Sequence, residues 1–196
     1  MKTTRWGLIG AGWIATKAIA PAIHAQPNAI LQGVASSDPK RAQLLNPITI
    51  HNSYEALIND PLVDAVYISL PNHLHCEWSI KALNAGKHVL CEKPFAMNVS
   101  EVESMARAAR DNNRLLVEAV SAMWHPRMKR LVDYVKAGNI GELVSIDSSF
   151  TFPASLEGNY RLSPAMGGGA LFDVGIYPLH AITALIGDDA STVIKS

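Results

Sequence analysis

From the start of the chain to about residue 120, short apolar runs alternate with segments of helical periodicity. Five of these runs are nearly continuously apolar, namely RWGLIG, AILQGVAS, DAVYISL, KHVLCE and RLLVEAV. Continuous apolarity, rather than alternation, marks strands covered on both faces, as in a parallel sheet. Because helical segments separate the runs and crossovers are right-handed, residues 1–120 are predicted to form a doubly wound α/β sheet.

Helix boundaries are also marked in this part of the sequence. Asp38 followed by Pro39 predicts an N-cap with proline at the first helical position. The segment SEVE, residues 100–103, fits a capping box, and Gly86 after IKALNA fits a C-cap. These positions predict where three of the helices begin or end.

After residue 120 the pattern changes. A helix fits PRMKRLVDYVKAG and is predicted to end at Gly138, and ELVSIDSSFTF then alternates like an amphipathic strand. A further helix fits GGGALFDVGIYPLH, with a distortion expected near Tyr177 because Pro178 follows it. STVIKS reads as the start of another strand. Residues 121–196 are therefore predicted to be the first part of an incomplete α+β domain, because isolated strands need partners.

Composition narrows the possible partners. The chain has 17 basic and 17 acidic side chains, and 48% of its residues are hydrophobic. Such a balance gives no field that would recruit nucleic acid or anionic lipid. Cys76 and Cys91 have neither metal-ligand spacing nor a disulfide framework, so we expect reduced, buried thiols and no metal site.

Two stretches resemble membrane or export segments. The start of the chain has a basic and then apolar character, but three glycines interrupt the apolar run. Residues 166–187 reach a spanning length, yet they contain consecutive glycines, Asp173, Pro178 and His180, which hydrocarbon penalises. We expect a cytoplasmic protein without a membrane partner.

The segment GLIGAGWIA carries a candidate dinucleotide loop. Gly10, Gly12 and Ala15 match the pattern GxGxxA between a predicted strand and a predicted helix. Gly10 would form the tight turn, Gly12 would let a pyrophosphate approach the backbone, and the helix N-terminus would face the phosphates. The alternative is that these glycines only allow close strand-to-helix packing. The position within a βαβ unit favours dinucleotide binding.

The end of the second strand indicates which dinucleotide. An NAD enzyme usually places an acid there for the ribose 2′-hydroxyl, whereas this chain has Ser36 and Ser37. Asp38 is already explained as an N-cap. Hydroxyls followed by Lys40 and Arg41 suit a 2′-phosphate, so NADP is predicted in preference to NAD. The alternative is that the two cations only occupy an exposed helical turn.

Further polar residues follow the next two strands. Asn72, His73 and His75 come after DAVYISL, and Lys93 in LCEKPFAM comes after HVLC. Ligands bind beyond the carboxyl ends of strands in such sheets, so these residues and the glycine loop are expected at one edge. Two histidines without a third ligand do not make a zinc site. Helix capping by Asn72 and surface histidines remain the alternative, and Pro94 could fix the turn in either cis or trans form.

In GGGALFDVGIYPLH, Asp173 and Tyr177 are four residues apart and would share one face of a helix, with His180 three residues further on. This pair could act on a substrate. The alternative is a helix cap and a core aromatic residue.

Taken together, these motifs resemble the glucose-fructose oxidoreductase, inositol dehydrogenase and MocA family. The resemblance rests on GLIGAGWIA, on DAVYISLPNHLHCEWSIKALNAGKHVLCEKPFAMN, on the HP pair at residues 125–126 and on NYRLSPAMGGGALFDVGIYPLH, and it covers nearly the whole chain. It implies an NAD(P)-binding Rossmann domain followed by an open, mostly antiparallel sheet domain. It also implies the branch that includes dimeric dihydrodiol dehydrogenase and D-xylose dehydrogenase.

The resemblance implies roles for individual residues. Lys93 corresponds to the catalytic lysine, Asp173 to the acid that binds substrate, and Tyr177 to the residue that transfers the proton. The predicted substrate-binding residues are Lys93, Arg161, Asp173 and Tyr177. The predicted cofactor-binding residues are Gly10, Gly12, Trp13, Ile14, Ser36, Ser37, Arg41, Leu70, Asn72, His75, Glu92 and Lys93.

Three functional hypotheses follow. The first is an enzyme that moves a hydride between NADP and a carbinol carbon of a sugar, polyol or dihydrodiol, as a homodimer if the second domain is complete. The second is a truncated fragment that binds NADP(H) without catalysis. The third, a methyltransferase that binds S-adenosylmethionine at the glycine loop, leaves EKP and DxGxY unexplained.

Overall fold

The computed structural model describes residues 2–153 and 159–187. The chain separates into two compact units, which are described one at a time. The first unit comprises residues 1–119 with 165–167, and the second comprises residues 120–164 with 168–196. The division lies next to the predicted domain boundary at residue 120.

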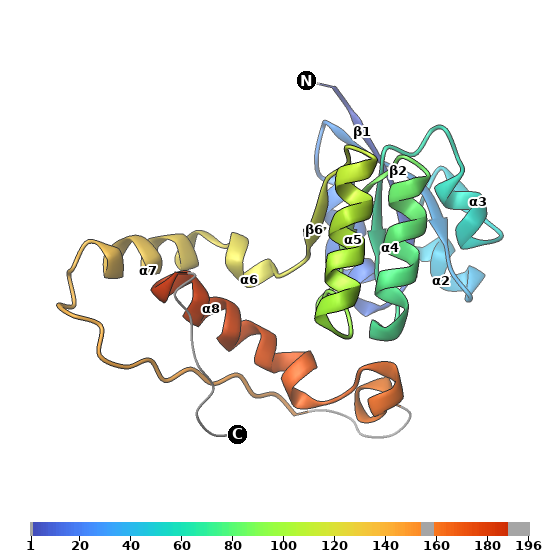
Figure 1. The fold of residues 1–196 in the computed structure, drawn as a ribbon. Helices are drawn as coiled ribbons and strands as arrows, with labels where there is room; N and C mark the ends of the chain where they lie inside the picture. Colours follow the sequence, from blue (N-terminus) through green and yellow to red (C-terminus); the bar gives the residue numbers. More distant parts are fainter. Residues whose placement is uncertain (1, 154–158, 188–196) are drawn as a thin grey trace. The chain divides into compact units, whose positions relative to one another are not determined.

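The first unit is built on one sheet of six parallel strands (Figure 1). The strand order is β3-β2-β1-β4-β5-β6. The chain runs from β1 outward to β3, returns to the middle of the sheet, and continues from β4 to β6 on the other side of β1. This confirms the predicted doubly wound α/β sheet and places a topological switch point beside β1. The strands are β1 (Thr4–Ile9), β2 (Ala29–Ala35), β3 (Thr49–His51), β4 (Ala65–Ile68), β5 (His88–Cys91) and β6 (Leu116–Glu118).

Five strands were predicted and β3 was missed. It has only three residues, pairs with β2 from Gly33 opposite Thr49, and lies at the edge of the sheet. An edge strand of this length contains no continuous apolar run, and that run was the signal that identified the other five strands.

The helices of the first unit cover both faces of the sheet. They are η1 (Ala15–Ile19), which is a π-helical stretch continuing into α1 (Ala20–His24), then α2 (Pro39–Leu44), α3 (Tyr54–Ile58), η2 (Asn72–Leu74), α4 (His75–Asn84) and α5 (Val99–Asp111). Asp38 caps α2 as predicted, since its Oδ1 accepts hydrogen bonds from the backbone N–H groups of Lys40 and Arg41. Gly86, with a φ of 78°, follows the end of α4 as predicted.

The predicted capping box at residues 100–103 is wrong by two positions. Asn98 caps α5 instead, accepting a hydrogen bond from the backbone N–H of Glu101 at 3.0 Å. Glu101 in turn accepts from the backbone N–H of Met97 at 2.9 Å. The reason is that Asn98 and Glu101 have the same spacing as a capping box, and asparagine is as good a cap as serine.

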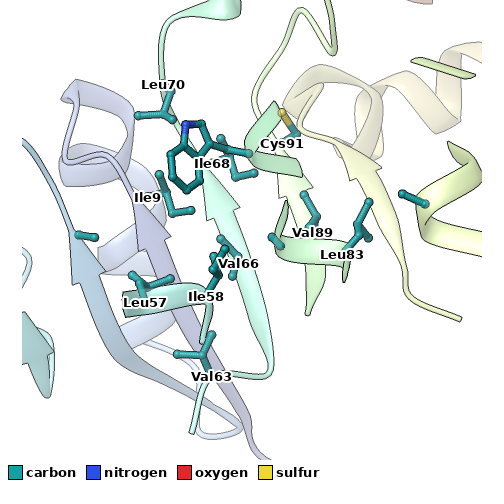
Figure 2. Close-up of a cluster of buried hydrophobic side chains, with 14 of the residues drawn as sticks. Ile9, Leu57, Ile58, Val63, Val66, Ile68, Leu70, Leu83, Val89 and Cys91 are labelled. Atoms are coloured by element: carbon teal, nitrogen blue, oxygen red, sulfur yellow. The ribbon is translucent and has the colours of Figure 1, made fainter. Parts of the chain in front are cut away.

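Two apolar clusters hold the first unit together, one on each face of the sheet. Figure 2 shows the cluster that includes Ile9, Val66 and Ile68 from the strands, with Leu57 and Leu83 from α3 and α4. The other cluster contains alternate strand residues such as Leu8, Val34 and Tyr67, packed with side chains of η1 and α1. Adjacent strand residues therefore enter different cores, which is why these strands are apolar without alternation.

Helices are the regular elements of the second unit over its described residues, and residues 139–153 form neither helix nor strand. Its elements are α6 (Ser121–Trp124), α7 (Pro126–Lys136), η3 (Tyr160–Leu162), η5 (Leu171–Gly175) and α8 (Ile176–Ile186), and η4 (Pro164–Met166) lies at the division between the units. The predicted helix ending at Gly138 is confirmed by α7 and by a φ of 75° at that glycine.

The strand predicted at ELVSIDSSFTF is wrong. Residues 142–152 form no strand, because within residues 120–153 and 159–187 no segment pairs with them. An amphipathic strand needs a neighbour to satisfy its backbone groups. The segment STVIKS lies outside the described residues.

The distortion predicted near Pro178 is present but starts earlier. A π-helical turn, η5, immediately precedes α8, and Pro178 is the third residue of α8. Proline lacks the N–H that would bond to the carbonyl four residues back and its ring crowds that carbonyl, so a wider turn is expected before it. The helical stretch of residues 164–186 could cross a membrane by length and apolarity alone, which is weak support for a span.

Candidate functional site

The loop after β1 brings three strand ends together. The backbone N–H of Gly10 donates to the carbonyl of Ala35 at 2.9 Å, and that of Ser69 donates to the carbonyl of Ile9 at 2.9 Å. Gly10 has a φ of 93°, and a Cβ built there would lie 2.5 Å from the Ser69 carbonyl oxygen. Only glycine fits this position, which is the tight-turn role predicted for it.

Gly12 has different surroundings. A Cβ built on Gly12 would meet nothing within 4 Å, and the side chain of the next residue, Trp13, is exposed. The hydroxyl and backbone N–H of Thr16 both donate to the Gly12 carbonyl at 3.0 Å, while Ile14 packs against the apolar cluster below. Hydrogen bonds and apolar packing therefore fix one side of the loop, and on the other side the backbone at Gly12 is open. An open backbone surface of this kind suits a phosphate group.

The loop after β2 presents the hydroxyls and cation predicted to recognise a 2′-phosphate. Ser36 Oγ accepts a hydrogen bond from the backbone N–H of Asp38 at 3.1 Å, whereas Ser37 is exposed. Arg41 is also exposed, and its Nε lies 3.3 Å from Asp38 Oδ2. Asp38 thus holds both the start of α2 and the Arg41 guanidinium.

Among the residues after β4, Leu70, Asn72 and His75 are buried, whereas His73 is exposed. The Leu70 side chain belongs to the cluster on the α4 face. Asn72 is buried, and its Nδ2 donates to the carbonyl of Gly167 at 2.7 Å. Gly167 has a φ of 78°, and a Cβ there would lie 2.7 Å from the Cβ of Asn72. Asn72 therefore holds residues 165–167 against the edge of the sheet.

His75 is fully buried at the start of α4. Its Nδ1 lies 2.7 Å from the Pro94 carbonyl oxygen and its Nε2 lies 2.9 Å from the Leu70 carbonyl oxygen. Burial lowers the pKa of His75, although both carbonyls oppose this effect. Both ring nitrogens face main-chain carbonyls, so His75 joins two loops, and the cofactor contact expected for it stays a prediction.

The turn after β5 is held from three sides. The Lys93–Pro94 peptide bond is cis. Glu92 Oε2 accepts a hydrogen bond from the backbone N–H of Lys93 at 3.3 Å, and Glu118 Oε1 accepts one from the backbone N–H of Phe95 at 3.0 Å. With His75 at the Pro94 carbonyl, successive backbone groups of the turn are bound by side chains from β6, α4 and the end of β5.

Glu92 has a buried partner. The hydroxyl of Tyr67 donates to Glu92 Oε1 at 2.6 Å, and Tyr67 is fully buried. Burial raises the pKa of Glu92, while the Tyr67 hydrogen bond and the charge of Lys93 lower it. Burial and the charge of Glu92 raise the pKa of Tyr67, so the phenol stays neutral and acts as a donor.

In the second unit, Arg161 and Asp173 form an ion pair. Arg161 Nε lies 2.9 Å from Asp173 Oδ1, and the Arg161 guanidinium lies over the Tyr160 ring. Partial burial alone would lower the pKa of Arg161, but Asp173 and neighbouring charges raise it overall. The backbone N–H groups of Gly168 and Gly169 donate to the carbonyls of Ser163 and Arg161. The consecutive glycines thus fold back on the turn that carries Arg161.

Tyr177 has an aromatic neighbour in the same unit. The rings of Phe150 and Tyr177 are stacked, with centroids 4.8 Å apart and an interplanar angle of 22°. This contact joins α8 to the segment in which a strand was predicted. The second unit therefore brings together an acid, an arginine and a phenol on neighbouring turns.

The structure groups the predicted residues into two sets. Gly10, Gly12, Ser36, Asn72 and Lys93 lie at the carboxyl edge of one sheet, as predicted. Arg161, Asp173 and Tyr177 belong to the second unit. The expected cooperation of Lys93 with Tyr177 stays a prediction.

Two residues of the site were missed by sequence reasoning. Glu118 is an acid at the end of a strand, and Tyr67 is the one aromatic residue in the strand run DAVYISL; either anomaly could have been noticed. Over residues 2–153 and 159–187, no group of three His, Cys, Asp or Glu side chains could hold a metal ion.

The parallel sheet, the glycine turn after β1 and the polar residues at one sheet edge define a Rossmann-type dinucleotide-binding fold. Comparison with known protein families supports this description of the fold. Residues 4–120 match the model described as "Oxidoreductase family, NAD-binding Rossmann fold", and residues 128–195 match the "GFO/IDH/MocA C-terminal domain". The chain belongs to the Gfo/Idh/MocA family of oxidoreductases.

Several relatives are similar to this chain over most of its length. A dTDP-3,4-didehydro-2,6-dideoxy-alpha-D-glucose 3-reductase from Actinomadura kijaniata is 37% identical, covering 96% of this chain and 58% of the relative. A D-xylose 1-dehydrogenase (NADP(+)) from Haloferax volcanii is 36% identical, covering 93% and 57%. The crystal structure of the Actinomadura 3-ketoreductase with NADP and TDP-benzene matches with a TM-score of 0.89, covering 95% of this chain and 58% of that one. The chain thus spans little more than half the length of these relatives.

Proposed function

We propose that this chain supplies the NADP-binding part, and the first part of the substrate domain, of a cytoplasmic dehydrogenase or reductase. The reaction would move a hydride between the nicotinamide and a carbinol carbon of a sugar, polyol or dihydrodiol. The observation that carries the proposal is the turn at Lys93, which three surrounding side chains hold at the carboxyl edge of the sheet. Preorganised groups at this edge are what a ligand-binding Rossmann sheet requires.

The cofactor assignment rests on the loops after β1 and β2. Gly12 leaves its backbone open, and Ser36, Ser37 and Arg41 offer hydroxyls and a guanidinium to a 2′-phosphate. The Haloferax relative is named as NADP-dependent, and the Actinomadura structure contains NADP. These observations support NADP over NAD.

Proton transfer is assigned to Tyr177. When bound, the nicotinamide would supply the redox chemistry. A phenol has an unperturbed pKa of about 10 and is a weak base at neutral pH, but a neighbouring ammonium favours its ionised form. We assign that ammonium to Lys93, the exchange of the hydroxyl proton to Tyr177 and the orientation of substrate hydroxyls to Asp173, which Arg161 holds in place.

Solved variants of a relative support the lysine and tyrosine assignments. Structures of the Actinomadura 3-ketoreductase include one with a tyrosine changed to phenylalanine and others with a lysine changed to alanine or glutamate. The two altered positions of that enzyme are separated by the same number of residues as Lys93 and Tyr177. Sugar ketone reduction and D-xylose oxidation, named for the relatives, are the two directions of the proposed chemistry.

The cofactor assignment is tested by titrating the protein with NADPH and NADH, following the fluorescence of the reduced nicotinamide. Arg41→Ala should weaken NADPH binding about tenfold and leave NADH binding unchanged, because only NADPH carries the 2′-phosphate. Arg130→Ala, an exposed arginine of α7, is the matched control. A clear preference of the unaltered chain for NADH would refute the NADP assignment.

The catalytic assignment is tested by Tyr177→Phe and Lys93→Met. Each should lower turnover by roughly 10²- to 10⁴-fold, as expected when a proton-transfer group is lost. Tyr134→Phe, an exposed phenol on α7, should turn over normally. Normal turnover by both site variants would contradict the assignment.

A second candidate function is non-catalytic binding of NADP(H). It is favoured by the distribution of buried side chains, since among residues 2–153 and 159–187 the buried hydrophobic side chains all lie at or before Val120. Turnover of a panel of sugars, polyols and diols by the 196-residue chain would exclude it. A homodimer is proposed only for a chain with a complete second domain, and its measurement is the mass in solution.

A further inference from the structure

The buried phenol of Tyr67 lies next to the turn at Lys93, and the proposed mechanism gives it no role. Tyr67 on β4 is fully buried, in an apolar cluster with Leu8 and Val34. A buried hydroxyl needs a hydrogen-bond partner. The partner is Glu92, whose Oε1 accepts from the Tyr67 hydroxyl at 2.6 Å.

The sheet register explains why these two side chains meet. Tyr67 pairs with Leu90 on β5, and Glu92 lies two residues beyond Leu90. Side chains alternate between faces along a strand, so Tyr67, Leu90 and Glu92 leave the same face of the sheet. Glu118 on β6 pairs with Cys91 on β5, which is the residue before Glu92. The Glu118 side chain therefore leaves the other face of the sheet and approaches the turn from there.

Glu92 connects this buried phenol to the turn. Its second oxygen, Oε2, accepts from the backbone N–H of Lys93 at 3.3 Å. Rotation of the carboxylate would break both hydrogen bonds, and the Tyr67 bond is the shorter of the two. Pro94 has no N–H with which to hold the carboxylate in its place.

We propose that Tyr67 is a positioning residue for the reaction: its hydroxyl holds the Glu92 carboxylate in the orientation and ionised state that fix the main chain at Lys93. This inference rests on the proposed function for its catalytic consequence. Because Tyr67 is fully buried, it is assigned to act through Glu92 and not by contact with substrate or cofactor.

The charged neighbours of Glu92 determine its response to pH. The titratable groups around it are the neutral Tyr67 from β4 and Cys91 from β5, together with Lys93 in the turn and Glu118 from β6. Burial and Glu118 favour the protonated form of Glu92, whereas Tyr67 and Lys93 favour the carboxylate. Removal of the phenol hydroxyl should therefore move the titration of Glu92 to higher pH.

The test is Tyr67→Phe, which removes one hydroxyl and keeps the ring. Tyr54→Phe is the matched control, because Tyr54 is a partly buried phenol of the same unit whose ring packs edge-on against Trp78. The first measurement is the pH titration of the Glu92 carboxyl carbon by NMR, assigned with Glu92→Gln. We expect an upward shift of the midpoint in Tyr67→Phe and none in Tyr54→Phe. An unchanged midpoint in Tyr67→Phe would overturn the inference.

The second measurement is the rate of hydride transfer against pH in a double-mutant cycle. Tyr67→Phe should lower the rate about tenfold on the acid side, as expected for losing a hydrogen bond to a charged group, with recovery on the alkaline side. In the Glu92→Gln background it should have no further effect. A pH-independent loss, or full additivity, would show a merely structural role and overturn the inference.

The two proposals fail in different ways. If the unaltered chain binds no nicotinamide cofactor, the proposed function is refuted, whereas the carboxyl titration still decides whether Tyr67 holds Glu92. If the chain binds cofactor without turnover, the same titration decides the inference, because it requires no reaction.

Discussion

The two units hold their candidate residues in different ways. In the first unit, the turn at Lys93 is bound by side chains from the ends of two strands of a doubly covered sheet and from helix α4, which packs on that sheet. In the second, the Arg161 and Asp173 side chains that pair are 38% and 14% exposed. Among residues 2–153 and 159–187, the buried hydrophobic side chains all lie at or before Val120. Positions in the first unit are thus set by a core, and those in the second by local turns and helix packing.

This difference predicts which unit keeps the geometry of its candidate residues when a nearby side chain is altered. A site built on buried strands keeps its geometry because displacement would expose apolar surface or break buried hydrogen bonds. A site built on partly exposed turns has less buried apolar surface and fewer buried hydrogen bonds to maintain its geometry. Four substitutions, ordered by expected effect on the free energy of unfolding, probe this contrast.

The largest effect is expected for truncation in the sheet core. Ile68→Ala removes a fully buried side chain from β4 and should cost about 2–5 kcal/mol. Leu179→Ala on α8, where the side chain is 51% exposed, should cost about 0.5 kcal/mol or less. Urea unfolding of the two variants measures the difference. Equal losses would mean that the second unit has a core of its own.

The next largest effect on the free energy of unfolding is expected at Lys87, a buried lysine directly before β5, at the amino end of the strand. Lys87 Nζ donates to the carbonyls of Asp60 and Val63 at 2.7 and 2.8 Å. Lys87→Met leaves both carbonyls without this donor and should cost about 2–3 kcal/mol. Lys129→Met, which breaks an exposed ion pair on α7, should leave the thermal midpoint unchanged.

A smaller, pH-dependent effect is expected at Asp64. The Arg5 guanidinium, which donates to both Asp64 oxygens, lowers the carboxyl pKa from 3.8 to about 2. Because the folded pKa is depressed, the contribution is complete above pH 3.8 and is lost as pH falls toward 2. Asp64→Asn should cost about 1 kcal/mol at neutral pH, since both side chains are partly exposed. Acid unfolding curves of variant and parent should converge near pH 2; a constant gap would contradict the assignment.

The smallest effect on stability is expected at the stacked rings. Phe150→Leu removes the aromatic face against Tyr177 and should cost about 0.5 kcal/mol, because Phe150 is half exposed. The near-ultraviolet circular dichroism of the tyrosine should nevertheless change. Phe152→Leu, at a similarly exposed phenylalanine, should change neither quantity.

Sequence patterns predicted the first unit well because its strands are buried on both faces. The runs RWGLIG and DAVYISL, which contain most of β1 and all of β4, were identified by apolarity alone, and Gly10 by its place between a strand and a helix. The cap of α5 was misplaced because Asn98 and Ser100 are both good caps and local spacing does not choose between them. The strand at 142–152 was wrong because a period of two records amphipathicity but not the presence of a neighbour.

The sequence by itself determined the Rossmann topology, the glycine loop and the position of Lys93 at a strand end. These features depend on apolar runs and on residue types with strong backbone preferences. Only the tertiary structure decided that Glu92 meets Tyr67 and that His75 joins two loops. Strand register brings residues 25 positions apart to within 2.6 Å, and local pattern contains no information about register between strands.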